Sequence, residues 1–91
     1  MQQRITANTL HAMIKHLNTL ESHVHPDDSK RYKNGSIWSI DYYPNLGVWI
    51  RRGHENPAST EHRMSVHDTW VFLSAIQYSL EYAYRKMSGQ V

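Results

Sequence analysis

The spacing of the hydrophobic residues changes twice along this chain, from helical to alternating and back to helical. Between Leu10 and Val24 they recur every three or four positions, which is the pattern of an amphipathic helix. Between Trp38 and Ile50 they alternate with polar residues on either side of a Pro-Asn-Leu-Gly turn, which predicts a β-hairpin. Helical spacing then returns. The pattern predicts one small α+β domain over residues 1–91, in which a long C-terminal helix packs on an antiparallel hairpin.

The first predicted helix covers roughly residues 7 to 24. Its hydrophobic stripe consists of Leu10, Met13, Ile14, Leu17, Leu20 and Val24. Thr6 or Asn8 can cap its N-terminus. Pro26 ends it, because proline disfavours helical geometry at the residue before it. The polar stretch 26–35 that follows is expected to be a surface loop or a pair of turns.

The register of the hairpin follows from which side chains must share a face. An odd-length loop would pair Asp41 with Arg51 across the two strands. It would place on the opposite, core-facing side Trp38, Ile40, Tyr42, Val48 and Ile50. We favour this register, although the turn residues resemble an even-length loop, and a bulge at Gly47 would reconcile the two. A third strand near residues 60–64 stays open.

The C-terminal helix is the most informative segment, because it carries two hydrophobic stripes. It is expected to begin at a capping box formed by Ser65 and Asp68 and to run to about Met87. The first stripe is Trp70, Leu73, Ile76, Leu80, Ala83 and Met87, and the second is Val71, Ala75, Tyr78 and Tyr82. Either the sheet and the first helix cover one stripe each, or the second stripe binds a partner or another copy of the chain.

The hairpin provides a second candidate interface in Tyr43, Trp49 and Arg51. Exposed aromatic residues beside arginine suit protein surfaces and stacked nucleic-acid bases equally. The alternative is that the first helix or a second subunit covers Trp49, because large aromatic side chains are usually mostly buried.

Basic residues near the hairpin lead to a nucleic-acid-binding alternative. They are Lys30, Arg31, Lys33, Arg51, Arg52 and Arg63. Acidic residues in the same part of the chain offset most of them, and the net charge of +2 is far below that of dedicated nucleic-acid binders. The order of the elements resembles that of double-stranded RNA-binding domains. Those domains carry a lysine cluster at the start of the last helix, where this chain has residues 65–69 without a lysine, so the resemblance assigns no binding residue.

Histidine is the remaining unusual feature of the composition, with seven residues. Those in or near predicted loops are His23, His25, His54, His62 and His67, and they are accompanied by Asp27, Asp28 and Asp68. Histidine with carboxylate is a ligand set that suits zinc, but the spacing does not place two ligands on one helical turn. We therefore assign no metal and no cofactor. The sequence contains no recognisable catalytic motif, and a small metal-dependent or acid–base enzyme is the third alternative.

We expect the chain to act as a small homodimeric binding module that regulates or inhibits a larger protein partner. The residues expected to carry this role are the second stripe of the last helix and the aromatic hairpin residues. No cysteine is present to form a disulfide framework. The longest uncharged stretch, Thr69 to Leu80, is shorter than the roughly 20 apolar residues of a membrane span, and the first residues lack a signal-peptide pattern. We therefore expect a cytoplasmic protein without a membrane segment.

Overall fold

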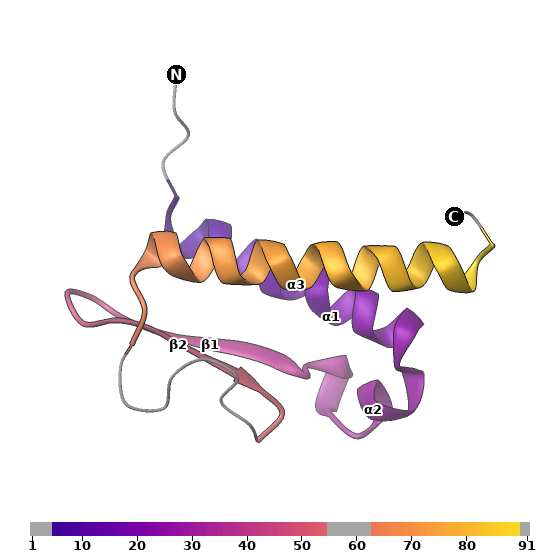
Figure 1. Ribbon diagram of the computed structural model, residues 1–91. Coiled ribbons are helices and arrows are strands. Elements are labelled where there is room, and N and C mark those ends of the chain that lie inside the picture. The colour runs from indigo at the N-terminus through magenta and orange to yellow at the C-terminus, as the bar shows by residue number, and fades with distance from the viewer. Residues whose placement is uncertain (1–4, 55–62, 90–91) are drawn as a thin grey trace.

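The computed structural model describes residues 5–54 and 63–89, and it has the predicted order of helix, hairpin and helix (Figure 1). Its elements are α1 (Ala7–Val24), α2 (Pro26–Lys30), the 3₁₀ turn η1 (Lys33–Gly35), β1 (Trp38–Tyr43), β2 (Gly47–Arg52) and α3 (Val66–Met87). The antiparallel hairpin with a long C-terminal helix packed on it confirms the α+β fold class.

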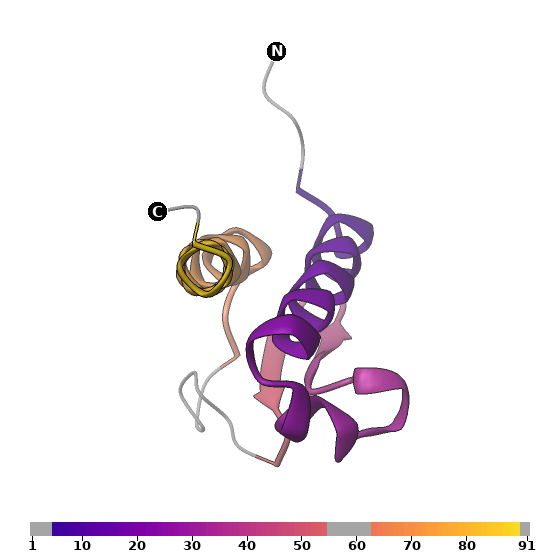
Figure 2. The same cartoon turned by 90° about the vertical axis from the view of Figure 1, so that its right-hand side faces the viewer.

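The helices α1 and α3 lie on one side of the hairpin and run side by side in the same direction (Figures 1 and 2). Their shared direction is visible in two contacts, His16 with Glu81 and, one to two turns later, His23 with Tyr84. α3 packs mainly along α1 and touches β2, whereas α1 also packs on β1. The hairpin therefore supports α1 most directly, and α3 completes the helical layer beside it.

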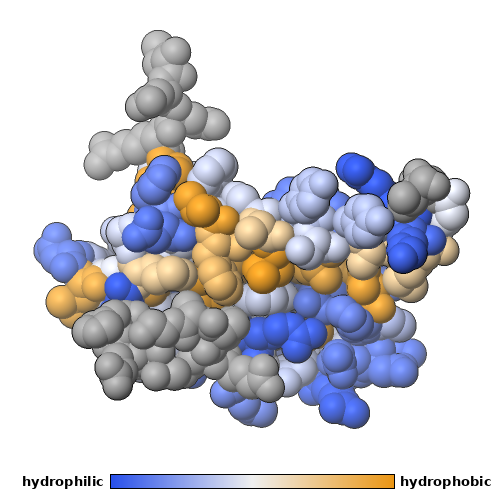
Figure 3. Space-filling view, viewed as in Figure 1, coloured by the Kyte–Doolittle hydropathy of each residue, from blue (hydrophilic) through white to orange (hydrophobic). Residues whose placement is uncertain are grey.

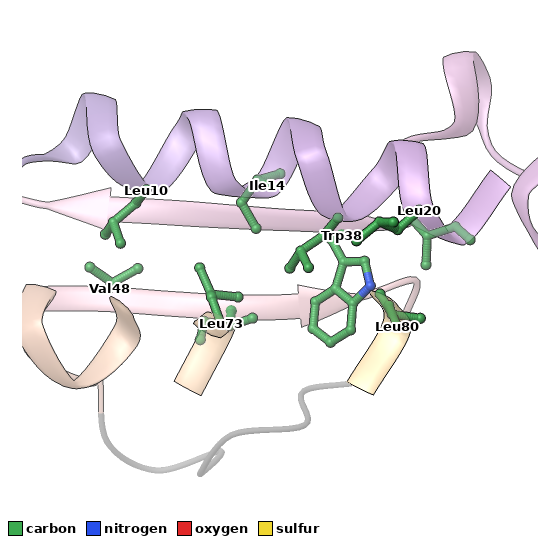
Figure 4. Packing of buried hydrophobic residues seen from close by; sticks show 10 residues of the cluster. Leu10, Ile14, Leu20, Trp38, Val48, Leu73 and Leu80 are labelled. Atoms are coloured by element: carbon green, nitrogen blue, oxygen red, sulfur yellow. The ribbon is translucent and has the colours of Figure 1, made fainter. Parts of the chain in front are cut away.

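The hydrophobic core lies between the two helices and the hairpin (Figure 4). It consists of Leu10, Ile14, Leu17, Leu20, Ile37, Trp38, Val48, Ile50, Leu73 and Leu80. In Figure 4 the side chains of Leu10, Val48 and Leu73 point toward one another from α1, β2 and α3. Burying about ten large side chains provides the main favourable free energy of folding, at roughly 25 cal/mol per Å² of apolar surface.

Helix α1 begins and ends as its sequence predicts. The Thr6 hydroxyl accepts a hydrogen bond from the Thr9 amide at 3.4 Å, and the Thr9 side chain accepts one from the Thr6 amide, which together form a capping box. The predicted loop after it is wrong in one respect, because residues 26–30 form the short helix α2. Pro26 at its first turn has a backbone preset for a helix, and Asp27 and Asp28 complement the helix dipole there.

The hairpin closes through a three-residue loop, so the predicted odd loop length and the predicted shared face are confirmed. Tyr42 is the exception to the predicted burial, because it lies on that face near the turn but is 42% exposed. Ile40 lies opposite Ile50, and Tyr43 lies opposite Gly47. The direct pairing of Asp41 with Arg51 is wrong, because Asp41 lies opposite Trp49. Arg51 still reaches Asp41 diagonally, with Nη2 of the guanidinium 3.7 Å from Oδ2.

The turn residues explain this register. Asn45 adopts a φ of 69°, which a type II turn requires at its third residue, and the Leu46 amide donates to the Tyr43 carbonyl at 2.9 Å. Gly47 then has a φ of 111°, and a Cβ there would lie 2.7 Å from the Met64 carbonyl oxygen. Only glycine fits both this backbone and this close approach.

Each edge of the hairpin is contacted at one residue within the described part of the chain. On the β1 side, the Asn18 side chain accepts from the Trp38 amide at 2.7 Å and donates to the Trp38 carbonyl at 3.1 Å. On the β2 side, Met64 exchanges two backbone hydrogen bonds with Val48. This antiparallel bridge lies at the end of the segment 60–64, where the sequence allows a third strand, and residues 60–62 lie outside the described residues.

Helix α3 begins where predicted, with the Ser65 hydroxyl accepting from the Asp68 amide at 3.0 Å. The reciprocal bond from the Ser65 amide to the Asp68 side chain is not formed between these two described residues, so only half of the predicted capping box occurs here. It continues for 22 residues to Met87, with Arg85 and Lys86 in its last turn. Among the helices of the described part of the chain, α3 included, none is long and apolar enough to cross a membrane.

Candidate interaction surfaces

Four residues of α3 point away from α1 and from the hairpin. They are Val71, Ala75, Tyr78 and Tyr82, and we call them the outer face of α3. At 100° per residue they lie on the side of the helix opposite the buried Leu73. Tyr78 is 72% exposed, and Val71 and Tyr82 are each 49% exposed. In Figure 3, orange and tan residues along α3 are interspersed with paler residues, because the Kyte–Doolittle scale rates tyrosine as weakly hydrophilic.

The opposite face of α3, which we call its inner face, supplies the core. Thr69, Leu73 and Leu80 are buried there, and Ile76 packs against the same cluster. Two members of the predicted first stripe are less buried, since Trp70 is at the side of the helix and Met87 lies near its end. The alternative in which α1 and the sheet cover one stripe each does not occur, because both lie on the same side of α3 (Figure 2).

Burial of Leu73 and Leu80 directs one side of α3 into the core, and polar contacts with α1 lie beside that side. Glu81 accepts a hydrogen bond from His16 of α1 at 3.3 Å and another from Gln77 one turn earlier at 3.1 Å. The bonds from His16 and Gln77 lower the pKa of Glu81 below its ordinary value, so the carboxylate stays ionised over a wider pH range. With Glu81 directed at α1, Tyr78 and Tyr82 are directed at solvent.

The hairpin side that faces away from the helices forms a second surface, built from Tyr43, Trp49, Arg51 and Arg63. The Arg63 guanidinium lies 4.4 Å from the ring centre of Tyr43 and 5.4 Å from that of Trp49. Arg51 lies 5.8 Å from the same indole. Trp49 is partly buried, and the two guanidinium groups flank its ring. We call these four residues the aromatic–arginine face.

The seven predicted partner-binding residues therefore belong to two surfaces rather than one. Tyr43, Trp49 and Arg51 come together on the hairpin, and the other four lie on the outer face of α3. Arg63 joins the hairpin group although the sequence placed it only among the basic residues. The Val48–Met64 bridge brings it there, because it lays residue 63 beside Trp49.

The six predicted basic residues do not form one positive patch. Arg52 lies 3.4 Å from Glu21 and 4.0 Å from Asp28, and Arg31 lies 4.0 Å from Asp28. Arg51 pairs with Asp41, and Arg63 lies against the aromatic rings. Lys30 and Lys33 are exposed near α2 and have no ion pair among the described residues. Three of the four arginines are therefore balanced by carboxylates of the same chain.

The structure also contains a buried polar cluster around Glu21 of α1, which the sequence analysis missed. Its side chain is 2% exposed and accepts hydrogen bonds from His25 at 2.7 Å, from the Trp38 indole at 3.1 Å and from Arg52 at 3.4 Å. Burial by itself would raise the pKa of Glu21, but these three donors together lower it below its ordinary value. The cluster ties α1 to both strands.

A sequence signal for this cluster existed. Glu21 follows Leu17 by one helical turn, so it falls on the hydrophobic stripe of α1, where an acidic residue requires a buried partner. Its partners Trp38 and Arg52 are 17 and 31 residues away in the sequence. No local pattern identifies partners at such separations.

Nothing in the described residues forms a group of three or more histidine, aspartate or glutamate side chains able to hold a metal ion. His62, one of the five loop histidines, lies outside the described residues. A cavity of about 720 Å³ opens between α1 and the segment from Asn34 to Ile40. Its described lining includes Lys15 and His11 but no carboxylate.

Comparison of this chain with protein-family models, with curated proteins and with solved structures found no match. The interpretation of function therefore depends on the two surfaces described above.

Proposed function

We propose that this protein is a homodimeric binding module that regulates or inhibits a larger protein partner. The observation that carries the proposal is the outer face of α3, where a helix already packed in a core presents a second hydrophobic stripe to solvent. Surface residues that are hydrophobic and contiguous mark protein-interaction sites more often than isolated ones do. Tyrosine adds a large contact area and a polar tip, which suits a surface that is exposed before it binds.

The two surfaces have separate roles in this proposal. The outer face of α3 joins two copies of the chain, and the aromatic–arginine face of each copy contacts the larger partner. Aromatic residues and arginine are the residue types that contribute most to binding energy at protein interfaces. Carboxylates within the chain balance Arg31, Arg51 and Arg52, which favours protein contacts over binding to a phosphate backbone.

The test of the dimer is sedimentation velocity over a wide range of protein concentrations, on the wild-type chain and on Tyr78→Lys. We expect the wild type to shift from monomer to dimer and Tyr78→Lys to stay monomeric, because a charge would be buried in the interface. Met87→Lys is the matched control, since Met87 is 62% exposed on the same helix but lies off the outer face. A wild-type chain that stays monomeric at every concentration would overturn the dimer.

The test of the second surface is a comparison of partner capture by wild type and by Arg63→Ala from an extract of the native host. The Ala variant removes the guanidinium that lies over Tyr43 and Trp49 while leaving α3 unchanged. We expect a specific protein to be retained by the wild type and lost with Arg63→Ala. Equal retention by both would exclude the aromatic–arginine face as the partner site.

A further inference from the structure

We propose that two copies of this chain pair through their α3 helices in an antiparallel arrangement, around a two-fold axis that passes between Ile76 and Gln77. This inference rests on the homodimer proposed above and specifies how it is built. The occupant of the outer face of α3 is thus the same face of a second copy.

The first observation is the spacing along the outer face. Val71, Ala75, Tyr78 and Tyr82 follow one another at intervals of four, three and four residues. Hydrophobic residues that alternate between these intervals repeat every 3.5 positions on average, which is the seam of a two-helix coiled coil. The inner face of α3 packs against α1 within the chain, so the outer face is available to another helix. We call its four residues the seam.

The second observation is that the four positions of this seam are symmetric about a midpoint in the helix. Residues 71 and 82 are equally distant from the midpoint at 76.5, and so are residues 75 and 78. In an antiparallel pair, Val71 therefore lies opposite Tyr82 of the second copy, and Ala75 lies opposite Tyr78 of the second copy. Each layer combines a small side chain with a large one, which allows the helices to approach closely without a void or a clash.

The third observation is the charge at the two ends of the seam. Asp68 precedes Val71 by three residues, Arg85 follows Tyr82 by three residues, and both are exposed. Asp68 and Arg85 are thus also symmetric about the midpoint. An antiparallel pair places each Asp68 opposite an Arg85 of the other copy, whereas a parallel pair would place like charges opposite each other at both ends. The charges therefore select the antiparallel arrangement.

Within one chain Asp68 and Arg85 cannot reach each other; Arg85 acts instead on Glu81 one turn earlier, where it adds to the bonds from His16 and Gln77 that lower the pKa of that carboxyl. Residues 68 and 85 are separated by 17 positions, which is roughly 25 Å along an α-helix. Neither side chain has an ion-pair partner within 4 Å among residues 5–54 and 63–89. A second copy brings both pairs together at the same time.

The length of the seam sets the expected strength of the dimer. Four residues on each helix form an interface smaller than the standard one, which buries about 800 Å² of each partner. We therefore expect a dimer that dissociates on dilution rather than an obligate one. Ser74 and Ser79 border the seam, and their small side chains leave room for the facing helix.

Cysteine crosslinking tests the arrangement directly, because the natural chain contains no cysteine. The variants Val71→Cys and Tyr82→Cys are prepared separately, one with a size tag, then mixed in equal amounts and oxidised. A disulfide requires Cα atoms within about 7 Å. In the antiparallel pair residue 71 meets residue 82 of the other copy, whereas identical positions are displaced by about 16 Å, the length of 11 helical residues.

We expect the mixture to form the disulfide between the two variants in large excess over disulfides between identical variants, and each variant alone to form almost none. Efficient disulfides within each variant alone would show a parallel pair and overturn the inference while leaving the homodimer intact. A wild-type dimer with no crosslink in the mixture would place the interface elsewhere. A monomeric wild type in sedimentation would instead overturn the proposed homodimer itself.

Discussion

The inner and outer faces of α3 both carry a hydrophobic stripe but have opposite surroundings. Leu73 on the inner face is fully buried against α1 and the hairpin. Tyr78, five residues later on the outer face, is mostly exposed. A helix with hydrophobic residues on more than one side is normally enclosed on more than one side, and here α1 and the hairpin both lie on the inner side.

This difference separates the residues that stabilise the folded chain from the residues that are exposed for binding. The inner face supplies folding energy and cannot change without affecting the monomer. The outer face contributes little to the monomer, and the proposed association would account for its hydrophobic residues. Substitutions on the inner face should therefore change the free energy of unfolding, and substitutions on the outer face should change the affinity of the proposed dimer.

The largest expected effect is on folding, from Leu73→Ala on the inner face. Removing a fully buried leucine side chain leaves a cavity, so we expect the free energy of unfolding to fall by about 3 kcal/mol. Val71→Ala on the outer face is the matched comparison and should change that free energy by less than about 0.5 kcal/mol in the monomer. Urea unfolding at low protein concentration measures both, and equal losses would contradict the distinction between the faces.

A smaller effect on folding is expected from Glu21→Gln. This variant tests how a buried polar cluster on the core side of the molecule contributes to stability as the pH changes. The pKa of Glu21 is lowered in the folded chain, so its ionised form stabilises folding above the unfolded pKa of about 4.3. That stabilisation is lost as the pH falls from this value through the folded pKa. We expect Glu21→Gln to destabilise the chain by about 2 kcal/mol at neutral pH.

The measurement is urea unfolding of wild type and Glu21→Gln at a series of pH values. The difference between the two should shrink as the pH falls below about 4.3, because protonated glutamate and glutamine then carry the same charge. A difference that stayed constant with pH would show that the bonds from Trp38 and Arg52 do not depend on the ionised carboxylate.

The smallest expected effect is on association, from reversing the charges at the ends of the outer face. Asp68→Lys and Arg85→Glu should each weaken the dimer several-fold, because each places like charges opposite one another at both ends of the seam; exposed ion pairs contribute about 0.2–1 kcal/mol each. The double variant restores opposite charges and should recover part of the affinity. Sedimentation equilibrium at low salt measures these changes, and additive losses in the double variant would contradict the pairing.

Much of the fold could be predicted because its signals are local. Thr6 and Ser65 cap helices whose hydrophobic spacing begins within a turn of them, and Pro26 marks the end of α1. The faces of the hairpin followed from alternation between polar and hydrophobic residues. The exact strand pairing did not, because it depends on the positive φ of Asn45, which decides where the three-residue loop closes.

The outer face of α3 and the aromatic–arginine face also differ in how far the sequence predicts them. Val71, Ala75, Tyr78 and Tyr82 could be grouped from spacing alone, since they share one helix. The position of Arg63 over Tyr43 and Trp49 could not be foreseen, because it depends on the backbone bridge between Val48 and Met64. The cluster around Glu21 likewise joins residues from α1, β1 and β2.

By itself, the sequence determined that the chain forms helix, hairpin and helix, and that its last helix carries two hydrophobic stripes. Which stripe is enclosed was decided only by the tertiary structure. Rotation of α3 about its axis is set by the packing of Leu73 and Leu80 against core residues of α1 and the hairpin, which lie far away in the sequence. Periodicity describes the stripes of one helix but contains no information about the side on which another helix packs, and that side leaves the outer face of α3 open.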